Sequence, residues 1–271
     1  WSSDVCSSDL EKEVVALILS DTRSSKAGEF LMRYLSNTKI SEEKFLAYLS
    51  SITRSLPASK VPAIIELAKT NMPNIPAYKK AIAINNGVKQ QGMSFPTSLK
   101  TWNIQTSQAV FKTYLTDNPN NTKQDLEALK YAIQLSGQLK SEDNIQPIKT
   151  LIKDSETASD LRELGVNAIM EIDPKNQIDF LKKWLGDANS SISFRKKIAE
   201  AIGKSTSNQA LDALGNGLKN IPMELQEHIA AQLSISEKGK SRLLKLIKEG
   251  HAPARVLKAR QVEERFLSGA N

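Results

Sequence analysis

Apolar residues recur at three- and four-residue steps along almost the whole chain, as in EFLMRYL (29–35), LEALKYAIQL (126–135) and RLLKLIKEG (242–250). This spacing places apolar side chains on one face of an α-helix, whereas the alternating pattern of a strand is essentially absent. Short breaks that carry Pro, Asn or Ser separate the segments, such as DNPNN (117–121) and GKSTSN (203–208). The pattern therefore predicts an all-α protein made of many short helices joined by tight turns.

The second half of the chain can be aligned with itself. Four apolar residues fall in register at intervals of 36, 33 and 31, namely Ile133, Ile169, Ile202 and Leu233. Each is followed by a second apolar segment with a pair of residues four apart: Ile148 and Ile152, Leu181 and Leu185, Leu214 and Leu218, Leu243 and Ile247. Two helices repeated every 30 to 40 residues or so are typical of a HEAT-like α–α solenoid, here of roughly seven helical pairs.

We expect residues 11–271 to form a single α-solenoid. The first half has the same kind of pattern in poorer register, and NNGVKQQGMSFPTSLKTW (85–102) is predicted to be the longest irregular connection. This stretch is a candidate boundary between two sub-arrays.

The first ten residues, WSSDVCSSDL, differ from everything that follows. They begin with Trp, contain no Lys or Arg and hold the only cysteine, Cys6. The string resembles the translation of a common sequencing-library adapter, so we interpret residues 1–10 as an artefact and expect the natural coding sequence to be cut off here. Removing Asp4 and Asp9 changes the formal charge from +7 to +9, and removing Cys6 leaves no thiol for a disulfide or a metal site.

Candidate chemistry is sparse. His228, in MELQEH, lacks the second histidine of a zinc helix, and His251 lies elsewhere in the last unit. Gly215 and Gly217 have neither a preceding strand nor the third glycine of a dinucleotide loop. Adjacent acids such as Glu42 and Glu43 point to different sides of a helix. The sequence therefore predicts no catalytic, cofactor-binding or metal-binding residue, and no apolar run approaches the ~18 residues that span a bilayer.

The distribution of charge is more informative. From residue 238 to residue 260 there is one acid, Glu249, against eight basic residues: Lys238, Lys240, Arg242, Lys245, Lys248, Arg255, Lys258 and Arg260. Such a cluster can bind an acidic protein or the phosphates of a nucleic acid, but solvated faces of solenoids are also Lys-rich. All three readings remain open, and the eight residues form a candidate anionic-partner patch.

The closing stretch SRLLKLIKEGHAPARVLKARQVEERFL (241–267) resembles the end of a helical-repeat region found in large bacterial proteins. These are the membrane-bound dehydrogenase-like or c-type haem-binding proteins of the planctomycete and bacteroidete type. VVALILSDTRSSKAGEFLMRYL (14–35) and EEKFLAYLSSITRSLPASKVPAIIELA (42–68) look like the opening units of the same region. The resemblance covers nearly all of residues 13–268.

The resemblance implies a place within a larger redox protein of the periplasm or cell envelope. A β-propeller similar to sugar dehydrogenases would precede the repeats, and a c-type haem domain with a Cys-x-x-Cys-His motif would follow them. The chain contains no such motif, so no catalytic or haem residue is carried over, and haem is expected only in the downstream domain. The expected function is a non-catalytic scaffold that contacts neighbouring domains or an acidic protein. The alternative is a nucleic-acid-binding HEAT-like protein that uses the basic C-terminal units.

Overall fold

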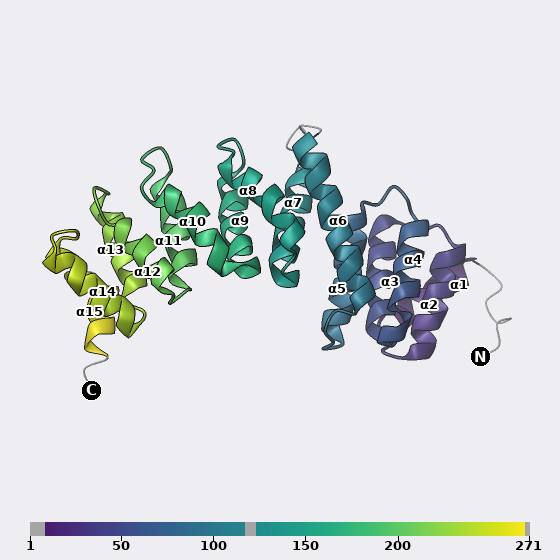
Figure 1. Ribbon diagram of the computed structural model, residues 1–271. Coiled ribbons are helices and arrows are strands. Elements are labelled where there is room, and N and C mark those ends of the chain that lie inside the picture. Colours follow the sequence, from purple (N-terminus) through teal and green to yellow (C-terminus); the bar gives the residue numbers. More distant parts are fainter. Residues whose placement is uncertain (1–8, 117–122, 269–271) are drawn as a thin grey trace. The chain divides into compact units, whose positions relative to one another are not determined.

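A computed structural model describes residues 9–116 and 123–268 of the chain. These residues form fifteen α-helices and three short 3-10 helices, with no strand among them (Figure 1). The all-α helical-repeat prediction is thereby confirmed. Residues 1–8 of the segment interpreted as an artefact lie outside the described residues. Helix α1 begins at Asp9, so the regular structure starts two residues before the predicted boundary.

The chain divides into two compact units, Trp1–Ala132 and Ile133–Asn271. The expectation of a single solenoid over residues 11–271 stays a prediction. The boundary falls inside helix α7, which is Lys123–Leu139, and not in the stretch 85–102.

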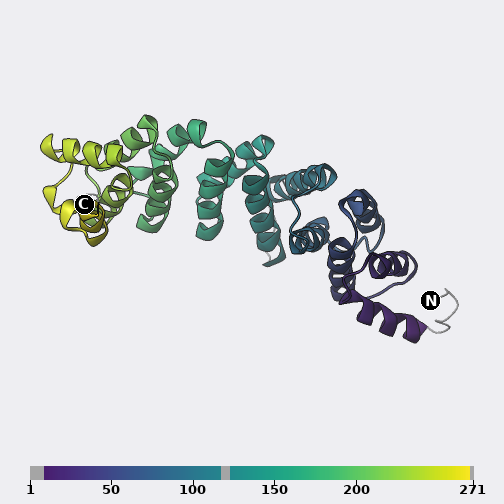
Figure 2. The same cartoon turned by 90° about the horizontal axis from the view of Figure 1, so that it is seen from below.

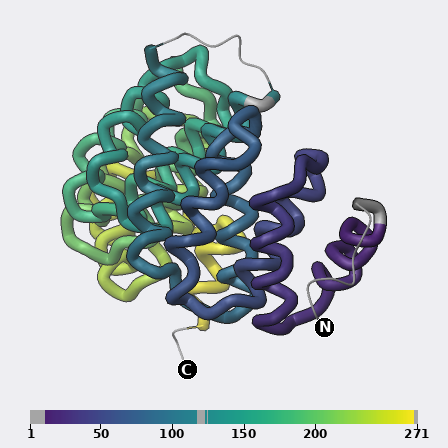
Figure 3. The backbone as a smooth tube through the Cα atoms, turned by 90° about the vertical axis from the view of Figure 1, so that its right-hand side faces the viewer, coloured from purple at the N-terminus to yellow at the C-terminus, as the bar shows by residue number. Residues whose placement is uncertain are grey.

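In the first unit, alternate helices form two layers. Its helices are α1 (Asp9–Ser20), α2 (Ser25–Asn37), α3 (Glu42–Ser55), α4 (Val61–Thr70), α5 (Ala77–Gln90), α6 (Thr97–Thr116) and the first part of α7, with the 3-10 turn η1 (Ala58–Lys60) before α4. Helix α3 packs against α1 and α5, whereas α4 packs against α2 and α6. Figure 3 shows the purple and blue helices of this unit side by side. The first unit is therefore a stack of helix pairs.

The predicted irregular connection at 85–102 is wrong, because most of it is helical. Only residues 91–96 lie between α5 and α6. Gly87 stays inside α5, where a Cβ atom would lie 2.5 Å from the Ser50 carbonyl oxygen, so the glycine permits close packing on α3. Asn85 is buried, and its side chain accepts a hydrogen bond of 2.9 Å from Asn103 Nδ2. The turn is made instead at Gly92, whose φ of +71° suits glycine.

The second unit repeats the two-layer arrangement. It contains the rest of α7, then α8 (Ile145–Lys153), α9 (Ser159–Ile172), α10 (Pro174–Leu185), α11 (Ile192–Gly203), α12 (Asn208–Asn216), α13 (Met223–Leu233), α14 (Glu237–Lys248) and α15 (Arg260–Leu267). Two 3-10 turns, η2 (Glu142–Asn144) and η3 (Ala254–Lys258), precede α8 and α15. Helices α9, α11, α13 and α15 pack in succession, and so do α10, α12 and α14, as the green and yellow helices of Figure 2 show.

The predicted register of the second unit is confirmed by burial. The four aligned residues, Ile133, Ile169, Ile202 and Leu233, are fully buried on α7, α9, α11 and α13. The predicted pairs on the second helices are buried as well, with one exception. Ile247 is only half-buried on α14, and Leu246 takes its place in the core.

A polar contact also repeats from pair to pair. The fourth residue of α9, Arg162, donates from Nε to the Ile152 carbonyl at the end of α8 (3.0 Å). The fourth residue of α11, Arg195, donates in the same way to the Leu185 carbonyl of α10 (2.8 Å). Carbonyls in the last turn of a helix have no partner within that helix, so each donor satisfies an acceptor that would otherwise be orphaned.

Two further helices use other residue types for the same task. Gln226, the fourth residue of α13, donates to the Leu218 carbonyl just after α12 (3.0 Å). In the first unit Lys80, the fourth residue of α5, donates from Nζ to the carbonyls of Ala68 (2.7 Å) and Asn71 (2.8 Å) at the end of α4. Burial lowers the pKa of Lys80. We call Lys80, Arg162, Arg195 and Gln226 the capping donors.

Truncating the buried register should destabilise the protein. Ile202→Ala is expected to lower the free energy of unfolding by about 2–5 kcal/mol, because burial is lost and a cavity remains. The matched control is Ile235→Ala, since Ile235 is exposed and its loss should cost no more than about 0.5 kcal/mol. Denaturant unfolding of both variants measures the difference, and equal effects would contradict the assigned core.

The capping donors provide a second test. Arg195→Met keeps much of the apolar stem but removes the donor to the Leu185 carbonyl, so we expect a loss of about 1–3 kcal/mol. Arg195→Lys should retain part of the stability, because Lys80 fills the equivalent position of α5. Chemical denaturation compares the two variants. If Met and Lys were equally tolerated, the hydrogen bond would have no role in stability.

Candidate anionic-partner surface

The structure places the eight basic residues of the predicted patch on three elements. Lys238, Lys240, Arg242, Lys245 and Lys248 belong to α14, Arg255 and Lys258 to η3, and Arg260 to the start of α15. Helix α14 begins where the Ser236 hydroxyl accepts from the Gly239 amide (3.1 Å). It buries Leu243 and Leu246, so its basic residues are left on the remaining sides.

Half of the patch is neutralised by ion pairs. Lys240 contacts Glu237 at 2.6 Å, Lys245 contacts Glu249 at 3.8 Å and Arg260 contacts Glu264 at 2.7 Å. Arg242 reaches across to Asp212 on α12, at 2.5 Å. Eight basic residues minus these four acids leave a surplus of four charges. The surplus is smaller than the sequence count implied.

Sequence reasoning missed the Asp212 partner, although the repeat contains a signal for it. Arg242 lies 30 residues after Asp212. Gln209 likewise lies 30 residues after Asp179, to which its amide donates at 3.2 Å. Two polar contacts between residues 30 positions apart thus link α10 to α12 and α12 to α14. Part of the charge on α14 is therefore used to hold neighbouring repeats together.

The other four cations have no ion pair or hydrogen bond from their side chains among the residues that the structure describes. They are Lys238, Lys248, Arg255 and Lys258, and all four are exposed. Lys238 and Lys245 lie seven residues apart on one side of α14, where they border an open hollow of about 620 Å³ between α12 and α14. The η3 cations lie on a turn that packs against α13 and α15. We call Lys238, Lys248, Arg255 and Lys258 the unpaired cations.

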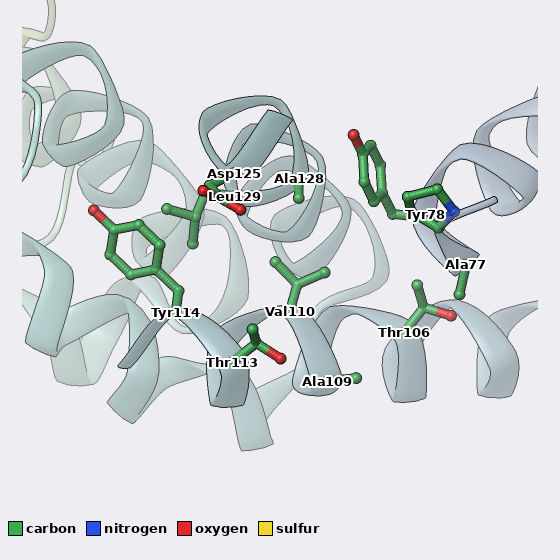
Figure 4. A pocket seen from close by; sticks show the side chains of 11 residues that line it. Ala77, Tyr78, Thr106, Ala109, Val110, Thr113, Tyr114, Asp125, Ala128 and Leu129 are labelled. Carbon is green, nitrogen blue, oxygen red and sulfur yellow. The ribbon is translucent and has the colours of Figure 1, made fainter. Parts of the chain in front are cut away.

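A second hollow, of about 270 Å³, lies in the first unit between the start of α5, α6 and the first part of α7 (Figure 4). Val110 and Leu129 line it, together with the rings of Tyr78 and Tyr114 and one carboxylate, Asp125. Burial raises the pKa of Tyr78, so its phenol stays protonated at neutral pH. General acid–base catalysis uses a positioned side chain whose pKa lies near the operating pH, and the lining of this hollow offers one carboxylate and two phenols. The sequence pattern did not predict this hollow.

Beside this hollow, a buried polar cluster joins α5, α6 and α7. Tyr131 donates from its hydroxyl to Asn103 Oδ1 at 3.0 Å, and Asn103 donates from Nδ2 to Asn85 Oδ1 at 2.9 Å. Burial raises the pKa of Tyr131, which keeps the hydroxyl in its donating form. The cluster satisfies its own polar groups and thereby fixes the packing of the three helices.

The minor candidates from the sequence have structural roles. Gly215 faces α14, where a Cβ atom would lie 2.9 Å from Leu246, so it permits close helix packing. In the described part of the chain, no three or more His, Cys, Asp or Glu residues lie together in a group that could hold a metal ion. None of the described helices is long and apolar enough to cross a membrane.

His228 of α13 is largely buried. Its side chain is 20% exposed, and Nε2 lies 3.4 Å from Glu200 Oε1 on α11, without forming a hydrogen bond. Glu200 also pairs with Lys197 at 3.2 Å, and Lys196 pairs with Glu224 at 2.5 Å. Burial lowers the pKa of His228 and outweighs the opposing effect of Glu200. The imidazole is therefore part of the contact between α11 and α13.

No protein family and no curated protein matches this chain. The resemblance to the helical region of membrane-bound dehydrogenase-like proteins consequently stays a prediction. The candidate surface has to be interpreted from its own geometry and charge.

The environment of His228 predicts a pH dependence of stability. Because its pKa is lower in the folded than in the unfolded protein, the unfolded chain binds more protons as the pH falls through the ordinary range of histidine. Stability should therefore decrease as the pH falls below about 6.5. His228→Gln should weaken this dependence, whereas His251→Gln serves as the control. Thermal unfolding from neutral to mildly acidic pH tests it, and an unchanged slope in His228→Gln would contradict the assignment.

Proposed function

We propose that this chain is a non-catalytic helical-repeat scaffold that binds an acidic surface through its last helix pairs. The observation that carries the proposal is the set of unpaired cations on α14 and η3, at positions where the neighbouring repeats supply no acid. Exposed cations without intramolecular partners attract anionic surfaces and speed up encounter with them. The hollow between α5, α6 and α7 has a single carboxylate, Asp125, among apolar and phenolic side chains.

The resemblance supplies the context of this proposal. In the parent protein the scaffold would lie between a sugar-dehydrogenase-like propeller and a c-type haem domain, in the periplasm or cell envelope. Its partner would be an acidic face of one of these neighbouring domains or of a separate acidic protein. Haem would be held by the downstream domain and not by this segment.

The natural gene tests this context directly. Cloning the locus from genomic DNA would extend the reading frame on both sides of the known sequence. An upstream propeller together with a downstream Cys-x-x-Cys-His motif would support the proposed parent. A complete short gene would contradict it.

Nucleic-acid binding is the alternative function, favoured by the formal charge of +7. Against it, the patch loses half of its charge to ion pairs, and the unpaired cations lie on two different elements. A few phosphate contacts support only nonspecific affinity, with a dissociation constant of about 10⁻⁴ to 10⁻⁶ M at physiological salt. We therefore expect weak binding of DNA without sequence preference.

A DNA titration distinguishes the two functions. Fluorescently labelled duplex DNA is titrated at about 50 and about 200 mM salt with the chain and with a variant in which the unpaired cations are changed together to Ser. A matched control changes four exposed lysines of the first unit to Ser: Lys26, Lys39, Lys89 and Lys100. Both variants lose the same formal charge, so a difference between them reports the position of the charge.

The outcomes are distinct. Submicromolar binding at physiological salt that is lost in the unpaired-cation variant and kept in the control would overturn the scaffold proposal in favour of the nucleic-acid one. Micromolar or weaker binding, reduced equally in both variants, is the result expected for a scaffold. The positive test is binding of the acidic neighbouring domain from the recovered gene, which the unpaired-cation variant should weaken and the control should not.

A further inference from the structure

Helices α8 and α10 carry a second group of cations, in a part of the chain whose sequence shows no excess of positive charge. Residues 149–183 include seven acidic and six basic residues. Three of the lysines, Lys149 and Lys153 on α8 and Lys183 on α10, form no ion pair and no hydrogen bond from their side chains among the residues that the structure describes. We call these three residues the α8–α10 lysines.

The ring of Phe180 on α10 is the common neighbour of these lysines. The Lys149 ammonium lies 4.9 Å from the centroid of the ring and the Lys153 ammonium lies 5.7 Å from it. Lys183 follows Phe180 by three residues, so it lies on the same side of α10. Lys153 and Lys183 are exposed, whereas Lys149 and Phe180 are half-buried. Three cations from two helices are thus placed beside one aromatic side chain.

The acids of α10 are engaged in other contacts. Asp173 accepts from the Asn176 amide at 3.2 Å and thereby caps the start of the helix. Asp179 pairs with Lys182 at 2.5 Å and also accepts from Gln209 of α12. Neither carboxylate lies within ion-pair distance of the α8–α10 lysines. The fold therefore separates the charges of this segment and leaves a local surplus of positive charge.

The surroundings of Lys149 show the effect of this surplus. Burial and the nearby charge of Lys153 both lower the pKa of Lys149, and Asp173 opposes them only in part. Lys149 is therefore a half-buried cation beside a second cation, and an anion at this place would stabilise both of them.

The next steps along the same layer are different. Between α10 and α12, the carboxylate of Asp179 meets the amide of Gln209. Between α12 and α14, Asp212 forms an ion pair with Arg242. In both places a neighbouring helix supplies the partner of an acid. Between α8 and α10 the cations meet a ring in place of a carboxylate.

We propose that the α8–α10 lysines bind an acidic peptide segment of a partner protein, whose carboxylates pair with the ammonium groups while its apolar atoms contact Phe180. Charge complementarity identifies this partner, because the stack itself supplies no carboxylate here. The surface lies on other helices than the unpaired cations of α14 and η3. The proposal is therefore independent of the proposed function.

The geometry favours carboxylates over phosphates. Phosphate sites often use the amide groups at a helix N-terminus or the fork of an arginine, whereas the α8–α10 lysines lie in the middle and the last turns of their helices. Stacking of a nucleic-acid base needs an open ring face, and Lys149 and Lys153 already lie against the ring of Phe180. An acidic peptide needs neither feature.

Lysine acetylation followed by mass spectrometry tests the site. The full chain is treated with a limiting amount of acetylating reagent at about 50 mM salt, alone, with a hexaglutamate peptide or with a hexaglutamine control, and the rate is measured at each lysine. We expect hexaglutamate to slow acetylation of the α8–α10 lysines by about threefold or more, because a paired ammonium is less accessible to the reagent. Lys26 and Lys39, which are exposed on the first unit, should react at unchanged rates.

Matched variants make the test specific. Lys153→Gln with Lys183→Gln changes two exposed positions and should remove most of the protection of Lys149 by hexaglutamate. Lys26→Gln with Lys39→Gln loses the same formal charge and should leave that protection intact. The variant without the unpaired cations should also retain it, so a failure of the proposed function and a failure of the present proposal give different results.

The outcomes decide the proposal. Protection of Lys149 that the Lys153 and Lys183 variant loses and both other variants keep would support it. Absence of protection, or equal protection at Lys26 and Lys39, would overturn it. Equal protection by inorganic phosphate, or protection by duplex DNA where hexaglutamate gives none, would assign the lysines to a phosphate ligand and overturn it as well.

Discussion

The carbonyl groups at the end of a buried helix must be hydrogen-bonded, and in this protein the next helix along the chain provides the donor. Arg162, Arg195 and Gln226 in the second unit and Lys80 in the first are each the fourth residue of their helix. A donor in the first turn reaches back to the end of the preceding helix only if the connection between them is short and of nearly constant length. The capping donors therefore help to fix the repeat length as well as the stability of each pair.

The same constraint is visible in the connections themselves. Asp154 accepts from the Glu156 amide (3.0 Å) and the Thr157 hydroxyl (3.0 Å). Asp187, 33 residues later, accepts from the Asn189 amide (3.1 Å) and the Ser190 hydroxyl (2.7 Å). The hydrogen bond from Ser190 lowers the pKa of Asp187, so the turn is most stable with the carboxylate ionised. Each of these turns precedes a helix whose fourth residue is a capping arginine. The aspartate turn and the capping arginine therefore recur together.

The sequence predicts some of this structure and misses the rest for physical reasons. The register of Ile169, Ile202 and Leu233 could be found because burial demands apolar residues at every repeat. The capping donors could not, because Lys, Arg and Gln all satisfy a carbonyl and no single residue type recurs. The stretch 85–102 was predicted wrongly because Asn and Gly have two uses. They form turns, but Gly87 and Asn85 serve close packing and a buried hydrogen bond inside α5.

The charges of the candidate surface follow from the same stacking. Within the stack, polar residues on successive helices of a layer pair with each other, as in Lys79 with Glu42, Lys196 with Glu224, and Arg242 with Asp212. Each such contact needs a helix on the next repeat. Among the described residues, Lys238 and Lys248 of α14 have no such partner. Stacking therefore uses Arg242 to join α14 to α12 and leaves the unpaired cations available for an anionic partner.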